Sequence, residues 1–197
     1  MLDLLAGLEP PWVLFGAGAL IGFHLGHRTS RDLDLAFRPL LALGETPREV
    51  EARLRLAGLE VEHVQRAVSF ARLRVRDASE AIELDLVADP TPAIEPPLEP
   101  RPGVRVETAR TLLAQKLGAL LSRTELRDLE DVGALIDAGG DLVRGLADAV
   151  QLDAGFSPPT LAWLLSSFPI ARAPEEGRDA ARLEAVRARL LDALRRP

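Results

Sequence analysis

Three acidic residues in the first half of the chain have the spacing expected of ligands for a hard cation. Asp32 and Asp34 stand two residues apart in a stretch that alternates acidic and apolar residues, and Asp85 lies in the later stretch A-I-E-L-D-L-V. Alternate residues of a strand project from one face with α-carbons about 6.6 Å apart, so the first two carboxylates can approach one ion. If the two strands are neighbours, three carboxylates surround one point, as in sites that hold Mg²⁺ or Mn²⁺ for phosphoryl transfer.

An isolated D-x-D pattern has a simpler interpretation, which is the solvent face of an edge strand. The surroundings of this pair favour the chemical interpretation. Asp32 and Asp34 follow a short apolar run, a glycine turn and a helical pattern, and they precede an acid embedded in an otherwise apolar strand.

Residues just before the acids could contact an anionic ligand. The turn Gly16-Ala17-Gly18 could bring backbone amides close to a phosphate at the start of a helix, although such turns are often only tight connections. Arg28 and Ser30 could contact triphosphate oxygens, and Arg28 equally suits an ordinary surface position.

A second group of charged residues lies in K-L-G-A-L-L-S-R-T-E-L-R-D-L-E-D. Lys116 is the one lysine among 24 cationic residues, and it stands two helical turns before Arg123, on the same face of a helix. A charged run is usually a solvated surface. Lys116, however, lies among four leucines, as a required point charge would, and we expect it to bind a triphosphate or stabilise a pyrophosphate leaving group.

The elements around these residues predict an α+β fold of two lobes. In residues 1–90 we expect a mixed sheet with flanking helices, and in residues 105–197 an α-helical lobe. Residues 91–104 form the connection between them, because DPTPAIEPPLEPRPG (89–103) is too rich in proline for regular structure. We expect any chemistry to lie where the lobes meet.

The expected elements follow from local patterns. Thr46 should cap a helix whose first residue is Pro47. The predicted strands are 12–15, 32–37, 60–63, 69–75 and 81–87; the predicted helices are 19–25, 46–57, 108–122, 125–138, 142–152, 159–167 and 178–195.

The composition limits the partners and the kind of metal site. A net charge of −6 argues against binding nucleic acid through a diffuse positive field, so an RNA acceptor would need a local arginine cluster. Arg72, Arg74 and Arg76 on one face of a strand, with Arg123 or Arg127 opposite, are candidates; the alternative is a solvated edge strand. The absence of cysteine leaves carboxylates as the metal ligands.

The remaining residue types give plainer expectations. No apolar run approaches a membrane span and no signal peptide is evident, so we expect a cytoplasmic protein. His24, His27 and His63 should be packed or surface imidazoles rather than metal ligands. Trp12 and Trp163 should be core residues.

Two blocks of sequence, G-A-G-A-L-I-G-F-H-L-G-H-R-T-S-R-D-L-D-L and the later K-L-G-A-L-L-S-R-T-E-L-R-D-L-E-D, resemble the AbiEii/AbiGii toxin-like nucleotidyltransferases, relatives of the DNA polymerase beta superfamily. The resemblance implies a polymerase-beta-like fold. It also implies metal-dependent transfer of a nucleoside monophosphate from an NTP to an acceptor hydroxyl, with release of pyrophosphate. The acceptor is a tRNA 3′ end in some members, and the protein is often a toxin with a cognate antitoxin.

The resemblance also implies roles for individual residues. Asp32 and Asp34 would be metal ligands, and Asp85 the third acid, which helps to activate the acceptor hydroxyl. Lys116 would contact the nucleotide phosphates. A later R-D element of the family corresponds to Arg127 and Asp128.

One departure from the family pattern concerns the glycine turn. Relatives commonly read G-G-T or G-G-S there, whereas this chain has Gly18 at the third position and lacks the hydroxyl, for which Ser30 could substitute. An alternative therefore stays open, a catalytically weak protein of the same fold that acts as a binding or regulatory module. The sequence does not choose between RNA and a protein hydroxyl as acceptor.

Overall fold

Seven strands of the first part of the chain form one mixed sheet, in the order β3-β4-β5-β2-β1-β7-β6. The β2–β5 and β1–β7 pairs are parallel and the other neighbours antiparallel. The computed structural model describes residues 1–30 and 32–195. The strands are β1 (Trp12–Phe15), β2 (Asp32–Phe37), β3 (Glu60–Arg66), β4 (Phe70–Arg76), β5 (Ala81–Ala88), β6 (Leu98–Arg101) and β7 (Val104–Val106).

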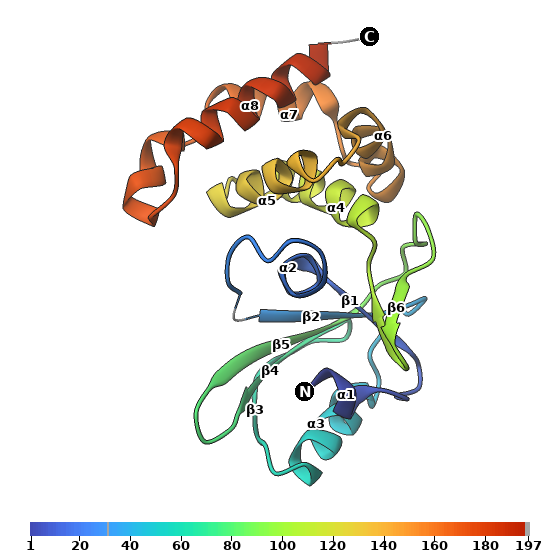
Figure 1. Cartoon of the computed structure of the whole chain (residues 1–197). Coiled ribbons are helices and arrows are strands. Elements are labelled where there is room, and N and C mark those ends of the chain that lie inside the picture. Colours follow the sequence, from blue (N-terminus) through green and yellow to red (C-terminus); the bar gives the residue numbers. More distant parts are fainter. Residues whose placement is uncertain (31, 196–197) are drawn as a thin grey trace. The chain divides into compact units, whose positions relative to one another are not determined.

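Helices lie on both sides of this sheet. The helices α1 (Leu2–Leu5) and α3 (Thr46–Leu56) lie on one side, and α2 (Gly16–Ala19) lies on the other side of β2 (Figure 1). A π-helical stretch, η1 (Leu20–Leu25), continues α2. The buried sheet core includes leucines at alternate positions, because alternate residues of a strand share a face: Leu35, Leu73, Leu84 and Leu86.

Local signals placed these elements well but erred at two helix starts. The predicted strands 12–15 and 32–37 are confirmed. The helix predicted over 19–25 begins earlier, as α2 at Gly16, and the positive φ of Gly16, +63°, lies within its first residue rather than in a preceding turn. Glu45, not Thr46, is the N-cap of α3, and Thr46 is buried inside the helix.

The prediction that residues 89–103 lack regular structure is wrong for β6. This strand pairs with β7 at the edge of the sheet, and its register with β7 is irregular between Leu98 and Arg101. An edge strand tolerates Pro100, because a missing N–H costs little where no neighbour accepts it. Proline content alone therefore did not exclude a strand.

The chain divides into two compact units, Met1–Thr108 and Ala109–Pro197. The second is helical, as predicted, and the α+β class is confirmed. No helix of the described residues is long and apolar enough to cross a membrane. The helices of the second unit are α4 (Ala109–Ser122), α5 (Leu126–Asp137), α6 (Leu142–Leu152), α7 (Pro158–Ser166), the 3-10 helix η2 (Ile170–Glu176) and α8 (Ala180–Arg195).

The two tryptophans have opposite environments. Trp12 is buried, and its Nε1 donates a hydrogen bond of 2.7 Å to Leu5 O. The prediction that Trp163 belongs to the core is wrong, because the residue is 69% exposed. Helix α7 buries Leu161 and Leu165, one turn apart, and a residue midway between them points to the opposite side.

Candidate active site

Asp34 and Asp85 lie directly opposite each other in the parallel pair β2–β5. Two residues earlier on the same strands, Asp32 lies opposite Glu83. Residues in register on neighbouring strands project from the same face, about 4.8 Å apart. The prediction that the strands of the three aspartates are neighbours with one shared face is therefore confirmed.

Asp85 is held by an arginine of the next strand. Arg72 of β4 is its cross-strand partner, and the guanidinium donates from Nε to Oδ1 and from Nη2 to Oδ2, both at 2.7 Å. The Asp85 side chain is 10% exposed. Within residues 1–30 and 32–195, no group of three or more His, Asp or Glu side chains is arranged to hold a metal ion.

The three aspartates still fit a divalent metal in kind. They offer hard oxygen donors on one face, with Asp34 and Asp85 side by side, and Arg72 already donates one hydrogen bond to each oxygen of Asp85. Their role as metal ligands stays a prediction.

Gly16 and Gly18, the two glycines of the turn, approach β2 closely. A β-carbon at Gly16 would collide with the carboxylate of Asp34, so any other residue would force that side chain to shift. At Gly18 a β-carbon would lie 2.8 Å from Leu33 Cδ2 and 3.2 Å from Asp32 O. The glycine that replaces the family's Ser or Thr therefore packs tightly on the strand that carries the acids.

Arg28 and Ser30 bond to nearby backbone groups. Arg28 Nη1 donates to Thr29 O at 3.1 Å. Ser30 Oγ accepts from Asp32 N at 3.3 Å and lies 3.4 Å from Asp32 O. The Ser30 hydroxyl thus contacts the backbone of Asp32, and its role as a substitute for the hydroxyl missing at Gly18 stays a prediction.

In the second unit, Lys116 is the centre of a buried ionic cluster. The residue is 5% exposed, and its Nζ lies 2.9 Å from Asp128 Oδ1 and 2.7 Å from Asp131 Oδ2. Arg123 also donates to Asp128, from Nε at 2.8 Å and Nη2 at 3.1 Å. Arg123 lies one residue past the end of α4, and it meets Lys116 at the carboxylate of Asp128.

Electrostatics keep Asp128 ionised. Burial acts to raise the pKa of its carboxyl, but the hydrogen bonds from Arg123 and Lys116 and their charges outweigh burial and hold the pKa below its usual range. Arg127 has a different environment: it contacts Glu125 and is 40% exposed. Of the two residues in the R-D element, Arg127 is therefore partly exposed and Asp128 is buried.

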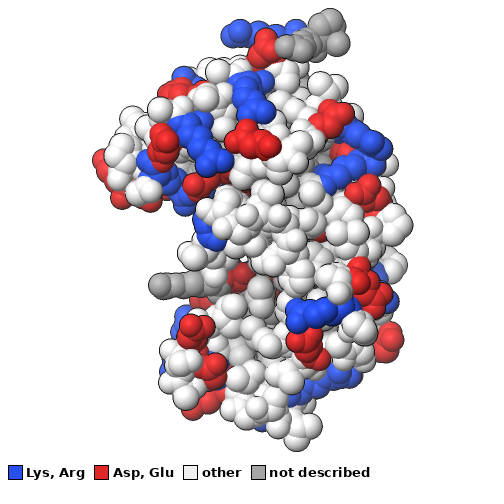
Figure 2. Space-filling view, viewed as in Figure 1, with Lys and Arg blue, Asp and Glu red and all other residues white. Residues whose placement is uncertain are grey.

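The three arginines of β4 share a face, as predicted, but two of them are neutralised. Arg72 binds Asp85, and Arg74 lies 3.3 Å from Glu83 and 3.6 Å from Glu62. Figure 2 shows basic and acidic side chains interspersed over the visible face. Cross-strand ion pairing explains the alternation of arginines on β4 without a groove for RNA.

Sequence patterns did not indicate a third ionic group, at the other end of the same strands. Arg38 follows β2 and binds Asp89, which follows β5, at 2.6 Å. Arg38 also pairs with the fully buried Glu107, and burial raises the pKa of that carboxyl. His24 Nε2 donates to Glu107 O at 2.8 Å. The sequence did contain a signal for this group. Arg38 and Asp89 are each four residues past Asp34 and Asp85, an even number, so they extend the same faces of the two strands.

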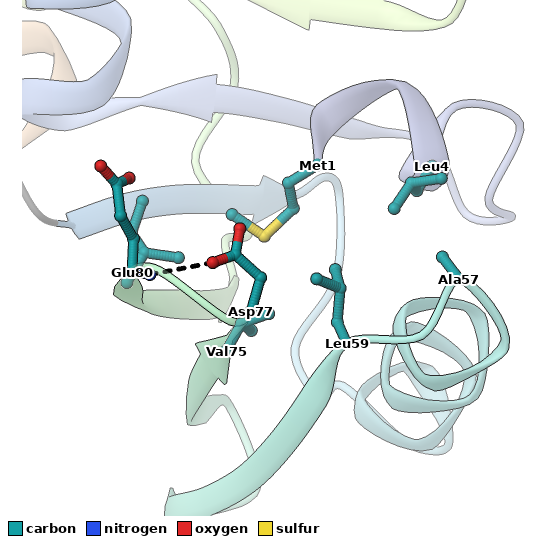
Figure 3. Close-up of a pocket in the computed structure, with 8 residues that line it drawn as sticks. Met1, Leu4, Ala57, Leu59, Val75, Asp77 and Glu80 are labelled. Carbon is teal, nitrogen blue, oxygen red and sulfur yellow. Dashed lines mark hydrogen bonds between the residues drawn. The ribbon is translucent and has the colours of Figure 1, made fainter.

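A pocket of about 380 Å³ lies on the opposite face of the sheet from the aspartates (Figure 3). Its walls include Val75 and Ile82, cross-strand partners whose side chains point away from the face of Arg74 and Glu83. None of the predicted site residues lines it. This pocket is therefore separate from the acidic face.

Comparisons with known proteins give a family match and a fold. The sequence matches the family described as "Nucleotidyl transferase AbiEii toxin, Type IV TA system" over residues 2–196. No curated protein sequence matches significantly.

Two solved structures are similar along nearly the whole chain. JHP933 from Helicobacter pylori has 20% identity and a TM-score of 0.62, over 98% of this chain and 88% of that one. MenT4, a nucleotidyltransferase toxin from Mycobacterium tuberculosis, has 19% identity and a TM-score of 0.57, over 94% of this chain and 74% of that one. At these identities the likeness is one of fold.

Proposed function

The chain belongs to the AbiEii nucleotidyl transferase toxin family of type IV toxin–antitoxin systems and is thus a nucleotidyltransferase, and from this membership we infer its reaction. We propose that it transfers a nucleoside monophosphate from an NTP to an acceptor hydroxyl. The acceptor hydroxyl belongs to RNA, such as a tRNA 3′ end, or to a protein. The acceptor oxygen attacks the α-phosphorus, the bond to the bridging oxygen of the β-phosphate breaks, and pyrophosphate leaves. The protein would act in the cytoplasm as a toxin, with a cognate antitoxin as its partner.

The register of Asp34 opposite Asp85 is the observation that supports this proposal most. Asp32, Asp34 and Asp85 would hold Mg²⁺ or Mn²⁺, which when bound neutralises triphosphate charge and activates the acceptor hydroxyl. Asp85 would also accept the proton of that hydroxyl, and Gly16 would leave the space in which Asp34 is oriented.

The cations and the glycine turn would bind the nucleotide. Gly16 and Gly18 would let backbone amides approach a phosphate, with Arg28 and Ser30 beside it. A second group of proposed nucleotide-binding residues lies in the helical unit: Lys116, Arg123, Arg127 and Asp128. Because two carboxylates enclose Lys116 Nζ, a triphosphate would compete with Asp128 and Asp131 for that ammonium group.

A labelling experiment tests the proposal and separates it from a non-catalytic binding role. The chain is incubated with each α-³²P-labelled NTP, Mg²⁺ and either total tRNA or a protein extract. We expect label in one acceptor class, lost at least about a hundredfold in Asp34→Asn. Asp77→Asn, an acid at the pocket on the opposite face, is the matched control and should retain transfer. No transfer by the wild type with any NTP, or transfer that survives Asp34→Asn, would refute the proposal.

A further inference from the structure

Arg72 and Asp85 form a fork-to-fork ion pair at the candidate site. Two nitrogens of the guanidinium meet the two oxygens of one carboxylate, each at 2.7 Å. This planar geometry gives the strongest of the usual side-chain ion pairs, and it engages both oxygens at once. Asp85, the acid expected to serve both metal and acceptor, is therefore occupied by a positive charge of the protein itself.

The surroundings of Arg72 are those of a cation site. Its Nη1 lies 3.4 Å from Glu83, and Asp34 lies beside Asp85 on the other neighbouring strand. The Arg72 side chain is 37% exposed, whereas Asp85 is 10% exposed. The arginine can therefore withdraw toward solvent, but the carboxylate cannot.

Arg74 provides an internal comparison. It lies two residues along β4 on the same face, with Glu83 at 3.3 Å and Glu62 at 3.6 Å. These are single, longer contacts, and none of them involves Asp85. If positive charge on this face affects metal binding in general, replacing either arginine should change the affinity. If the fork with Asp85 is responsible, only replacement of Arg72 should change it.

We propose that Arg72 is a displaceable counter-cation of Asp85: it occupies this carboxylate in the metal-free protein and is displaced when a divalent metal binds, and so sets the metal affinity of the site. The inference rests on the proposed function, because it takes Asp85 as a metal ligand. Arg72 acts through Asp85 and is a positioning residue. Metal entry breaks two charge-assisted hydrogen bonds and separates the guanidinium from the carboxylate.

Binding of Mn²⁺ without nucleotide, followed by electron paramagnetic resonance, tests this inference independently of turnover. Arg72→Gln removes the fork and the charge, and should bind Mn²⁺ about tenfold more tightly than the wild type. Arg72→Lys keeps the charge without the fork and should be intermediate. Arg74→Gln, the matched control, should change the affinity by less than about threefold.

The possible results separate this inference from the proposed function. Unchanged or weaker Mn²⁺ binding in Arg72→Gln, in a variant whose circular dichroism matches the wild type, would overturn the inference. If Arg72→Gln does not fold, Arg72→Lys decides by the same criterion. Asp34→Asn should abolish binding in every background. If it does not, or if no variant binds Mn²⁺, the proposed metal site is wrong as well.

Discussion

The carboxylate of Asp34 lies so close to Gly16 that a β-carbon at position 16 would collide with it. Gly16 is the first residue of α2 and follows the strand that pairs with the strand of Asp34. The reversal of the chain after β1 and the placement of the Asp34 carboxylate are therefore one structural feature.

Gly16→Ala should lower activity more than its backbone conformation alone explains. The positive φ of +63° costs any L-residue about 1 kcal/mol of stability, and the collision with Asp34 adds to it. Gly44→Ala is the matched control, because Gly44 has φ +54° and open space around its β-carbon position. We expect both variants to be less stable in urea, but only Gly16→Ala to lose nucleotide transfer, by at least about tenfold. Equal transfer by the two variants would argue against the role of this contact.

Lys116→Gln should destabilise the protein by about 3 kcal/mol, because it leaves Asp131 and part of Asp128 as buried charges without their ammonium partner. Arg127→Gln serves as control on the neighbouring helix: Arg127 is 40% exposed, and its removal should cost less than about 1 kcal/mol. Equilibrium urea unfolding measures both. A Lys116 variant as stable as the wild type would mean that the buried cluster contributes nothing to folding.

Stability should fall in acid partly through Asp148. Hydrogen bonds from Arg110, at 2.6 and 2.7 Å, hold the pKa of Asp148 below its ordinary value of 3.8. The folded state binds this proton less readily than the unfolded state, so the stabilisation is complete above pH 3.8 and is lost as the pH falls through the lower folded value. Asp148→Asn should cost about 2 kcal/mol at pH 7 and much less at pH 2. A cost that is the same at both pH values would contradict this assignment.

Gly18→Ser restores the hydroxyl that relatives carry, but into a tight space. Leu33 Cδ2 would lie 2.8 Å from the new β-carbon, so the single variant should lose about 1 kcal/mol of stability. The double variant with Leu33→Ala relieves this contact and should bind NTP about tenfold more tightly than Leu33→Ala alone, through one added hydrogen bond to phosphate. Calorimetry that shows equal affinities would indicate that the hydroxyl has no phosphate to meet.

Local patterns predicted which face of its strand each of the three aspartates occupies, because strand parity is a local property. Asp32 and Asp34 alternate with apolar residues, and the same alternation around Asp85 required one shared face once the strands paired. What the patterns could not supply was the partner of each charge. Arg72 meets Asp85 only through the register of β4 on β5, which depends on the turn between them.

The same limit applies to the second unit. The apolar neighbours of Lys116 indicated a required point charge, but its burial and its enclosure by Asp128 and Asp131 depend on how α4 and α5 pack. Trp163 shows the reverse error. Its type suggested burial, whereas its place on the helix, midway between two buried leucines, determined its exposure.

Anomalous diffraction from Mn²⁺, in crystals of the protein with a non-hydrolysable NTP, would measure the central claim most directly. The account predicts a manganese peak coordinated by carboxylate oxygens of Asp34 and Asp85 and by the triphosphate, with Arg72 withdrawn from Asp85. A triphosphate bound with its metal away from both aspartates would contradict it.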